Sequence, residues 1–423
     1  MLERLRRLHP FTTPDAQRLA LLFGTVYFAQ GMWYLPNQTI TIVLKERGLS
    51  AGQVADFFLV ATVPWLIKPV YGLISDFVPL WGRRRKSYYV LTTALAIVAG
   101  TALALWAGHP YGSMVVMFTV MGLGLAFTDV LTDALMVENG RARGLTGAFQ
   151  SVQWAAITAA SIAVGLLGGQ LAGARNLALA FALAACLPAV SLVMGLRFID
   201  ERPAVVDRAA ARETWRAIRA AMADRGVWGV AGFIFFYTFS PSFGPAFLYY
   251  QTDVLGFGQE FIGALDSVYY AAAMVGAIVY APLSRRMPLK RLIVGAIGAA
   301  LVSTLAYLLY RDRASALGIQ VLFGVVAMIT QLAFLDLAAK ACPRRVEATF
   351  FALLMSVYNA GVQLSQNVGA RLYDGYGYTP LVLISAALTA LAWPLVPLVG
   401  IDRIEARARA ERAPETTPAR VSE

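Results

Sequence analysis

The chain has 423 residues, of which 58% are hydrophobic and 14% charged, and its mean hydropathy is +0.61. Soluble domains carry about 25% charged residues, so this composition excludes an ordinary soluble protein and indicates a bilayer as the solvent. The net charge of +11 does not by itself indicate nucleic-acid binding, because basic residues also gather in the cytoplasmic loops of membrane proteins. With two Cys and two His, neither a disulfide framework nor a metal site is expected, and no cofactor is predicted.

Apolar stretches of roughly 20 residues, the length that crosses a bilayer, follow one another along the chain. The first is long and lacks a small-residue cleavage site, so it is expected to be a retained helix rather than a signal peptide. The predicted fold class is an all-α membrane protein of twelve transmembrane helices. These are expected at residues 19–44, 52–75, 88–107, 112–137, 147–171, 177–197, 227–251, 261–283, 289–310, 315–340, 347–370 and 378–400.

The basic residues indicate how the chain is oriented in the membrane. Only a few lie in the connections on the side opposite the N-terminus: Lys45, Arg47, Arg175, Arg311, Arg313 and Arg371. Lys68 lies within a span, and all other Lys and Arg residues fall on the side of the N-terminus. Because basic residues favour the cytoplasmic side, both termini are expected to be cytoplasmic in a multi-pass protein of the inner membrane.

The longest connection, residues 198–226, is rich in Arg and Ala and is predicted to be a cytoplasmic linker with an amphipathic helix. It separates an N-terminal bundle, 1–197, from a C-terminal bundle, 227–400, which is followed by a cytoplasmic tail, 401–423. Two short matches recur in order at a nearly constant separation: 127–129 with 334–336, and 151–156 with 356–361. Two pseudo-symmetric six-helix bundles follow, the architecture of the major facilitator superfamily.

The connection after the second span is predicted to take part in gating. Gly72 and Asp76 precede Gly82 and a basic run that begins with Arg83 and Arg84, which resembles that superfamily's signature loop with its basic cluster delayed. Asp76 is expected to pair at a helix end while the arginines hold the cytoplasmic face in one of two packings. A plain positively charged loop would explain the arginines but not Gly72 and Asp76.

Four stretches resemble the folate-biopterin transporter family. They are residues 64–76 (PWLIKPVYGLISD) with the basic run 83–85, residues 129–138 (DVLTDALMVE), residues 247–250 with 255–263, and residues 343–361, the last being the most specific. They occur in order across both halves. The resemblance implies transport of a folate- or pterin-like compound, although Asp266 stands where the family is expected to have a basic residue.

Ionisable side chains inside a bilayer cost a few kcal/mol each, so those within spans are candidate functional residues. Lys68 lies deep in the second span beside Pro69 and is expected to meet either a substrate carboxylate or an internal acid. Asp129 and Asp133 lie four residues apart on one helical face and can carry a proton in turn, which makes them the predicted coupling residues. The alternative is a permanent ion pair with Lys68.

Two further acids occur in the second half. Asp336 occupies the place equivalent to Asp129 and is a predicted gating residue, but Lys340 one turn later favours a structural pair. Asp266 is expected near the outer end of its span, either as a gate residue or at the membrane interface.

Aromatic and amide side chains are expected to complete a binding site for a flat heterocycle. In the first span, the spacing of polar residues predicts one continuous face. The predicted substrate-binding residues, together with Lys68, are Gln30, Tyr34, Asn37, Gln153, Trp154, Tyr237, Tyr269, Asn359 and Gln363. Glycines 165, 168 and 169 are expected to allow close packing of helices.

No nucleotide-binding motif occurs, and no segment is long enough for an ATPase domain, so the predicted activity is secondary active transport, driven by protons. The expected partners are a small-molecule substrate, protons and lipid, with no nucleic acid, and a monomer suffices. An integral-membrane enzyme is not favoured, because no HExxH or nucleophile elbow occurs. The remaining alternatives are a carrier for another organic metabolite and a transporter-derived receptor or assembly factor.

Overall fold

The computed structural model describes residues 10–201, 203, 208–223, 225–342 and 347–412, and within these it contains helices and no β-strand. The all-α class is therefore confirmed. The first half comprises α2 (Pro14–Gly31), η1 (Met32–Tyr34), α3 (Asn37–Glu46), α4 (Ala51–Leu66), α5 (Lys68–Phe77), α6 (Lys86–Leu105), α7 (Tyr111–Arg143), α8 (Thr146–Gly173) and α9 (Leu177–Phe198). After α10 (Arg208–Met222) come α11 (Arg225–Thr238), α12 (Ala246–Tyr249), η2 (Tyr250–Val254), α13 (Gln259–Arg286), α14 (Leu289–Ala306), η3 (Tyr307–Leu309), α15 (Arg313–Ala341), α16 (Glu347–Tyr376), α17 (Tyr378–Leu391), η5 (Trp393–Leu395), α18 (Val396–Val399) and α19 (Ile401–Arg412).

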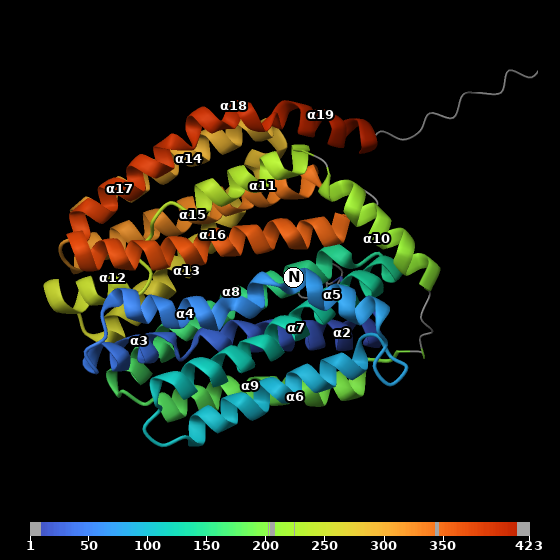
Figure 1. The fold of residues 1–423 in the computed structure, drawn as a ribbon, viewed down its shortest axis with the longest axis horizontal. Helices are drawn as coiled ribbons and strands as arrows, with labels where there is room; N and C mark the ends of the chain where they lie inside the picture. The colour runs from blue at the N-terminus through green and yellow to red at the C-terminus, as the bar shows by residue number, and fades with distance from the viewer. Residues whose placement is uncertain (1–9, 202, 204–207, 224, 343–346, 413–423) are drawn as a thin grey trace, which may run out of the picture.

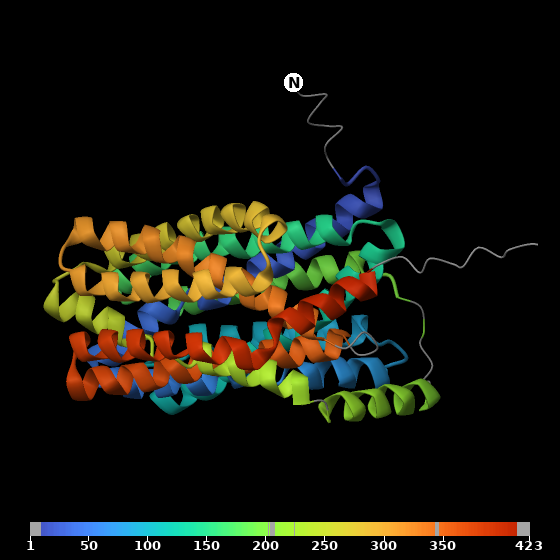
Figure 2. The same cartoon turned by 90° about the horizontal axis from the view of Figure 1, so that it is seen from above.

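The long helices run roughly parallel in two groups that lie one above the other in Figure 1. In the lower group α2 packs on α8, and α6 packs on both α7 and α9; in the upper group α13 and α14 pack on α15. Two helix pairs join the groups, α8 with α13 and α4 with α16. Figure 2 shows α10 at one end of this body, close to the ends of α5 and α16 in that view.

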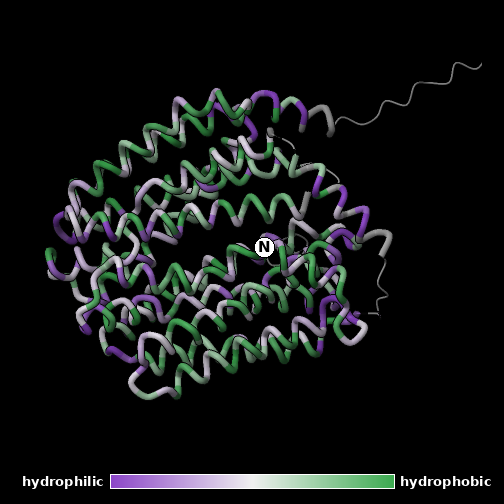
Figure 3. The backbone as a smooth tube through the Cα atoms, viewed as in Figure 1, coloured by the Kyte–Doolittle hydropathy of each residue, from purple (hydrophilic) through white to green (hydrophobic). Residues whose placement is uncertain are grey.

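Hydrophobic residues occupy the middle of the helices, and hydrophilic ones collect at both ends of the body (Figure 3). Nine helices among the described residues are long and apolar enough to cross a membrane. The other three expected spans coincide with α2 to α3, α11 to α12, and α16. The first two are interrupted, and α16 carries several amides, so the count of twelve spans stays a prediction.

Prolines explain the interruptions, because proline lacks a backbone donor and clashes with the carbonyl four residues earlier. Pro69 follows the break between α4 and α5, and Pro241 and Pro245 lie in the irregular segment between α11 and α12. Pro36 separates α2 and η1 from α3. That break was not predicted, and it divides the polar face that was expected to be continuous in the first span.

Small residues allow the two groups to meet closely at α8 and α13. A Cβ atom on Gly165 would lie 2.3 Å from the Ser267 Oγ, and one on Gly263 would lie 2.2 Å from the Gly165 carbonyl oxygen. Gly169 faces the backbone of α13 in the same way. The predicted packing role of these α8 glycines is confirmed, and the resulting contact sets one wall of the central cavity.

Candidate functional site

A cavity of about 560 Å³ lies where the two groups of helices meet. The upper group supplies most of its wall, from α11, the irregular segment after it, and α13 to α17. The lower group contributes residues after α2, namely Tyr34, Leu35, Asn37 and Gln38, and Val164 and Gly165 of α8. The cavity is large enough for a small metabolite.

The break between α11 and α12 opens this cavity into the upper group. Gly244 has a positive φ of 48°, and the Ser242 carbonyl oxygen would lie only 1.8 Å from a Cβ atom on Gly369 of α16. The irregular segment therefore lies directly against α16 because both positions lack a side chain. Irregular backbone at membrane depth is tolerated where it lines a cavity, which is the case here.

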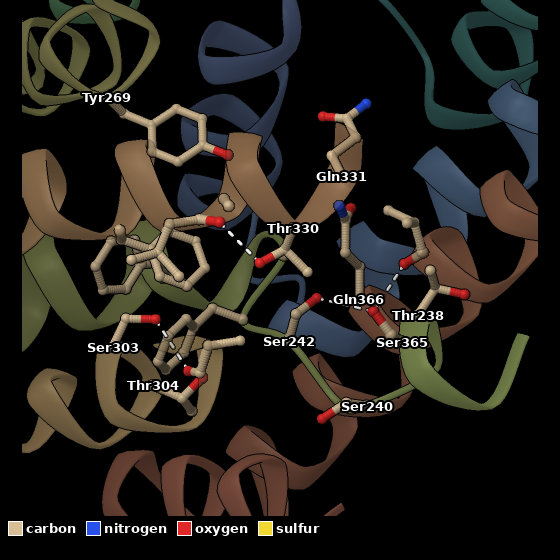
Figure 4. A pocket seen from close by; sticks show the side chains of 18 of the residues that line it. Thr238, Ser240, Ser242, Tyr269, Ser303, Thr304, Thr330, Gln331, Ser365 and Gln366 are labelled. Carbon is tan, nitrogen blue, oxygen red and sulfur yellow. Dashed lines mark hydrogen bonds between the residues drawn. The ribbon is translucent and has the colours of Figure 1, made fainter. Parts of the chain in front are cut away.

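Hydroxyl groups cover the wall on either side of this break (Figure 4). The Ser242 and Ser365 hydroxyls lie 2.9 Å apart, and the Ser240 hydroxyl lies 2.9 Å from the Ser385 carbonyl oxygen and 3.0 Å from the Thr389 hydroxyl. Figure 4 also shows Gln331 and Gln366 on this wall. Such groups can each donate and accept a hydrogen bond, so the wall suits a ligand with several polar atoms.

Aromatic rings form the opposite part of the cavity. Tyr269 and Tyr270 come from α13, Tyr307 follows α14, and Phe323 lies on α15. The Tyr269 and Phe323 ring centroids are 6.0 Å apart, and those of Tyr307 and Phe323 are 5.2 Å apart. Rings in this arrangement offer flat apolar faces for a heterocycle.

An intramembrane charge cluster lies in the lower group. Lys68, the first residue of α5, forms an ion pair with Asp129 of α7, whose side chain is 4% exposed. The lysine Nζ also lies 4.8 Å from the centre of the Trp65 ring. Because the helix breaks before α5, Lys68 at the start of α5 points toward α7. The structure therefore contains the internal ion pair, which is one of the two alternatives predicted from the sequence.

Asp133 has different partners from Asp129. It accepts hydrogen bonds from the Tyr27 hydroxyl and, at 3.2 Å, from the Gln153 amide. Asp133 therefore joins α2, α7 and α8, while Asp129 joins α7 to α5. Tyr34 connects this cluster to the cavity, since it lines the cavity and interacts electrostatically with Lys68 and Asp129.

The predicted substrate-binding residues fall into three groups. Tyr34, Asn37, Tyr237 and Tyr269 line the cavity. Lys68 and Gln153 belong to the charge cluster, and Gln30 lines a small pocket beside Asp129. Trp154, Asn359 and Gln363 are not among the residues that line the cavity. Asn359 and Gln363 lie eight and four residues before Asn367, so they share the face of α16 that meets α4.

The predicted gating residues are only partly brought together. Asp76 pairs with Arg85 at 2.6 Å, and Arg85 also binds Glu138 at 3.0 Å and the Ser75 hydroxyl at 2.7 Å. Asp76 therefore pairs at a helix end as expected, and its partner is Arg85 rather than either predicted gating arginine, Arg83 or Arg84. Arg85 is the buried member of the basic run because Glu201 accepts the backbone N–H groups of residues 84–86 and fixes the start of α6.

The other two gating positions behave differently. Gly72 faces the Val130 side chain of α7 at an ordinary contact distance of 3.7 Å for an added Cβ atom, so the position is not crowded. Asp336 pairs with Lys340 at 2.7 Å within α15. The predicted pair one turn apart is confirmed, and it differs from Asp129, whose lysine comes from another helix.

Contacts that join the outer helix ends of the two groups were missed. Arg371 of α16 binds Asp56 of α4 at 2.8 Å, and the Asn367 amide donates to the same carboxylate at 2.8 Å. Asp374 accepts the backbone N–H groups of residues 51 and 52 at the start of α4. Lys45 and Asp253 pair at 2.6 Å. Sequence reasoning counted Arg371 and Lys45 as loop cations, and only opposite charge at the outer helix ends could have suggested these pairs.

Asp266 was expected to be a gate residue or to lie at the interface, but it lines the cavity among the tyrosines. Within the described ranges no group of three His, Cys, Asp or Glu side chains could hold a metal ion. The groups available to act on a ligand are therefore hydroxyls, amides, aromatic rings and a few buried charges.

Known proteins resemble this chain in sequence and in fold. The model of a family described as the BT1 family matches residues 29–411. A protein of Synechocystis sp. described as a folate-biopterin transporter is 31% identical over 414 residues, which cover 91% of this chain and 82% of that protein. A solved peptide transporter, POT, has a TM-score of 0.70 at 16% identity, covering 91% of this chain and 95% of that one. A solved nucleoside transporter has a TM-score of 0.67 at 12% identity, covering 93% and 99%. These likenesses confirm the predicted major facilitator fold.

Proposed function

Because the chain belongs to the BT1 family, the folate-biopterin transporters that its sequence resembles, we propose that it carries a folate- or pterin-like compound by proton-coupled alternating access. The protein is a multi-pass membrane transporter of small metabolites. The substrate class rests on the resemblance and on the description of the Synechocystis relative.

The observation that carries this proposal is the position of the cavity. It lies between two helix groups, has polar and aromatic walls, and adjoins an intramembrane charge cluster through Tyr34. A site between two bodies that can rock is what alternating access requires. We take the two bodies to be the bundles 1–197 and 227–400, joined by the linker 198–226 and followed by the tail 401–423.

The contacts between these bodies support one closed end. Among the described residues, the hydrogen bonds and ion pairs that join the first half to the second involve residues 38–56 and 162 on one side and 249–267 and 367–374 on the other. Most of these lie toward the helix ends opposite α10, and the Ile162–Ser267 hydrogen bond lies deeper, within α8 and α13. In the proposed cycle, this end opens when the Asp56–Arg371 contact breaks. The opposite end then closes around the gate formed by Asp76 and Arg85.

The charge cluster supports proton coupling. A buried carboxylate can exchange its lysine partner for a proton, and this exchange changes the electrostatic energy of the cavity beside it. Asp129 is the proposed coupling residue, since it holds Lys68 and interacts with Tyr34. Asp133 is the proposed second acid, held by Tyr27 and Gln153.

The remaining features of the proposal concern the membrane. The distribution of Lys and Arg supports an inner-membrane location with both termini in the cytoplasm. A monomer suffices, because the cavity is built within one chain.

The test is uptake into proteoliposomes of labelled folate, reduced pterins, an amino acid and a nucleoside, with and without an imposed proton gradient. We expect gradient-driven accumulation of a pterin or folate, lost in Asp129→Asn. Accumulation of another compound would keep the transport mechanism and reject the substrate class. If folded protein accumulates nothing, a receptor or assembly-factor role replaces the proposal, and turnover of a compound would indicate an enzyme.

A further inference from the structure

The Asp266 carboxylate faces the central cavity and has no partner among the residues that the structure describes. It lies on α13 and its side chain is exposed to the cavity that it lines. No hydrogen bond or ion pair joins it to any other described residue. A carboxylate at membrane depth costs several kcal/mol unless something compensates it, so this position requires an explanation.

Three other acids within the long helices, further from the helix ends than Glu260, have such compensation. Asp129 has Lys68, Asp133 has Tyr27 and Gln153, and Asp336 has Lys340. These groups are satisfied before any ligand arrives. Asp266 is left with both carboxylate oxygens available, so its partner is best supplied by the molecule that enters the cavity.

The backbone holds Asp266 in a fixed position. The next residue, Ser267, donates its hydroxyl hydrogen bond to the Ile162 carbonyl oxygen of α8 at 2.8 Å. One turn earlier, Gly263 packs directly on Gly165. Asp266 is therefore held at the contact between the two helix groups, and such rigid support is what a recognition residue needs.

Tyrosine side chains line the cavity near this carboxylate. Tyr269 and Tyr270 follow Asp266 by about one turn of α13, and Tyr307 lines the same cavity. A flat ring system that lies among these aromatic side chains would present its edge, rather than its face, to the carboxylate. The edge that matches two acceptor oxygens carries two adjacent N–H donors.

We infer that Asp266 binds the donor edge of a flat heterocycle, formed by a ring N–H beside an exocyclic amino group, as in a 2-amino-4-oxopyrimidine ring. This inference rests on the proposed function, because it takes the cavity to be the transport site. Two parallel N–H···O bonds to a carboxylate fix the orientation of the ring as well as its identity. The carboxylate also repels an anionic substituent, so the charged tail of a folate must point away from Asp266.

The experiment compares two ligands and two forms of the protein. Equilibrium binding and proteoliposome uptake are measured for biopterin and for the analogue in which oxygen replaces the 2-amino group. Wild-type protein is expected to prefer biopterin by roughly 10- to 100-fold, the value of a paired hydrogen bond to a charged acceptor. In Asp266→Asn, which keeps the size of the side chain, the preference is expected to fall to within about threefold.

Two further variants control the comparison. Asp266→Glu keeps the carboxylate and is expected to retain a preference for the amino compound. Asp312→Asn makes the same chemical change at an exposed position before α15, where Asn also caps a helix well, and is expected to match the wild type.

The outcomes separate the inference from the proposed function. If wild type and Asp266→Asn discriminate equally, or if wild type does not discriminate, the inference is wrong while pterin transport stands. Loss of gradient-driven accumulation in Asp266→Asn with discrimination unchanged would also overturn it, since Asp266 would then carry a proton rather than the ligand. If no pterin or folate binds or moves in wild-type protein, the proposed function fails and the inference fails with it.

Discussion

Removing one partner of the Lys68–Asp129 pair tests whether these residues serve the fold, transport, or both. The relevant variants are Lys68→Met, Asp129→Asn and the double variant. Each single variant removes one charge and leaves the other in a site where the Asp129 side chain is 4% exposed and the Lys68 side chain 21% exposed. The double variant leaves no unpaired charge.

The magnitude follows from burial. Breaking a buried ion pair by removing one partner costs about 3–5 kcal/mol, whereas replacing both partners with neutral groups is often neutral or stabilising. Since Lys68 keeps a cation–π contact with Trp65, Asp129→Asn is expected to lie at the lower end of that range. Lys68→Met leaves the more buried Asp129 carboxylate without its partner. Its loss of stability is expected to lie at the upper end of the range unless Asp129 takes up a proton.

The assay combines thermal unfolding of the purified protein with uptake into proteoliposomes. Both single variants are expected to unfold at lower temperature, and the double variant is expected to regain most of that loss without regaining transport. The matched control is Asp336→Asn, at the equivalent place in α15. Its pair with Lys340 lies within one helix and the Asp336 side chain is 29% exposed, so about 0.5 kcal/mol or less is expected.

Two results would refute this reasoning. Wild-type uptake by the double variant would mean that the pair serves only the fold. Unfolding temperatures of the single variants equal to that of Asp336→Asn would mean that the pair is not a buried interaction of the expected kind.

Three further variants test the closed end, the helix contact and the gate. Arg371→Ala is expected to increase labelling of the cavity from the closed end several-fold while costing less than about 1 kcal/mol of stability, because the ion pair is exposed. Gly263→Val is expected to cost about 1–3 kcal/mol in thermal unfolding and to abolish uptake, whereas Gly295→Val, with open space around it, is expected to do neither. Arg85→Lys is expected to slow uptake about tenfold, because lysine cannot hold two carboxylates and a hydroxyl, while Arg83→Lys is expected to leave it unchanged.

Each of these expectations has a clear contrary result. Unchanged labelling in the Arg371 variant would remove that ion pair from the closed end. Equal stability of the two glycine variants would mean that the helices can separate without cost. Equal uptake by the two lysine variants would mean that the gate depends on charge alone.

The membrane class and most helix positions could be predicted because they depend on local sequence. Apolar runs of spanning length, the prolines at 69, 241 and 245, and the glycines of α8 act within a few residues of where they occur. The break at Pro36 was missed because the polar residues on both sides of it, Tyr34 and Asn37, were assigned to one continuous helical face. Its consequence is that Gln30 lies beside Asp129 while Tyr34 and Asn37 line the cavity.

The partners of charged residues could not be predicted in the same way. The basic run 83–86 offers several arginines, and the choice of Arg85 depends on Glu201, which lies more than a hundred residues later and fixes the start of α6. Arg371 and Asp56 likewise meet only because α16 packs on α4. For Asp266, the sequence left the choice between gate and interface open.

The sequence by itself determined that this chain is a helical membrane protein and which family it resembles. It also identified the ionisable residues whose free-energy cost in a bilayer indicates a function. These features depend only on the local segment: the length of an apolar run, the position of a proline, and the free-energy cost of a charge within the membrane. Only the tertiary structure decided that Lys68 is held by Asp129, while Asp266 faces the cavity with no partner in the described part of the chain. Pairing depends on which helices are neighbours, and neighbours are chosen by packing over the whole chain.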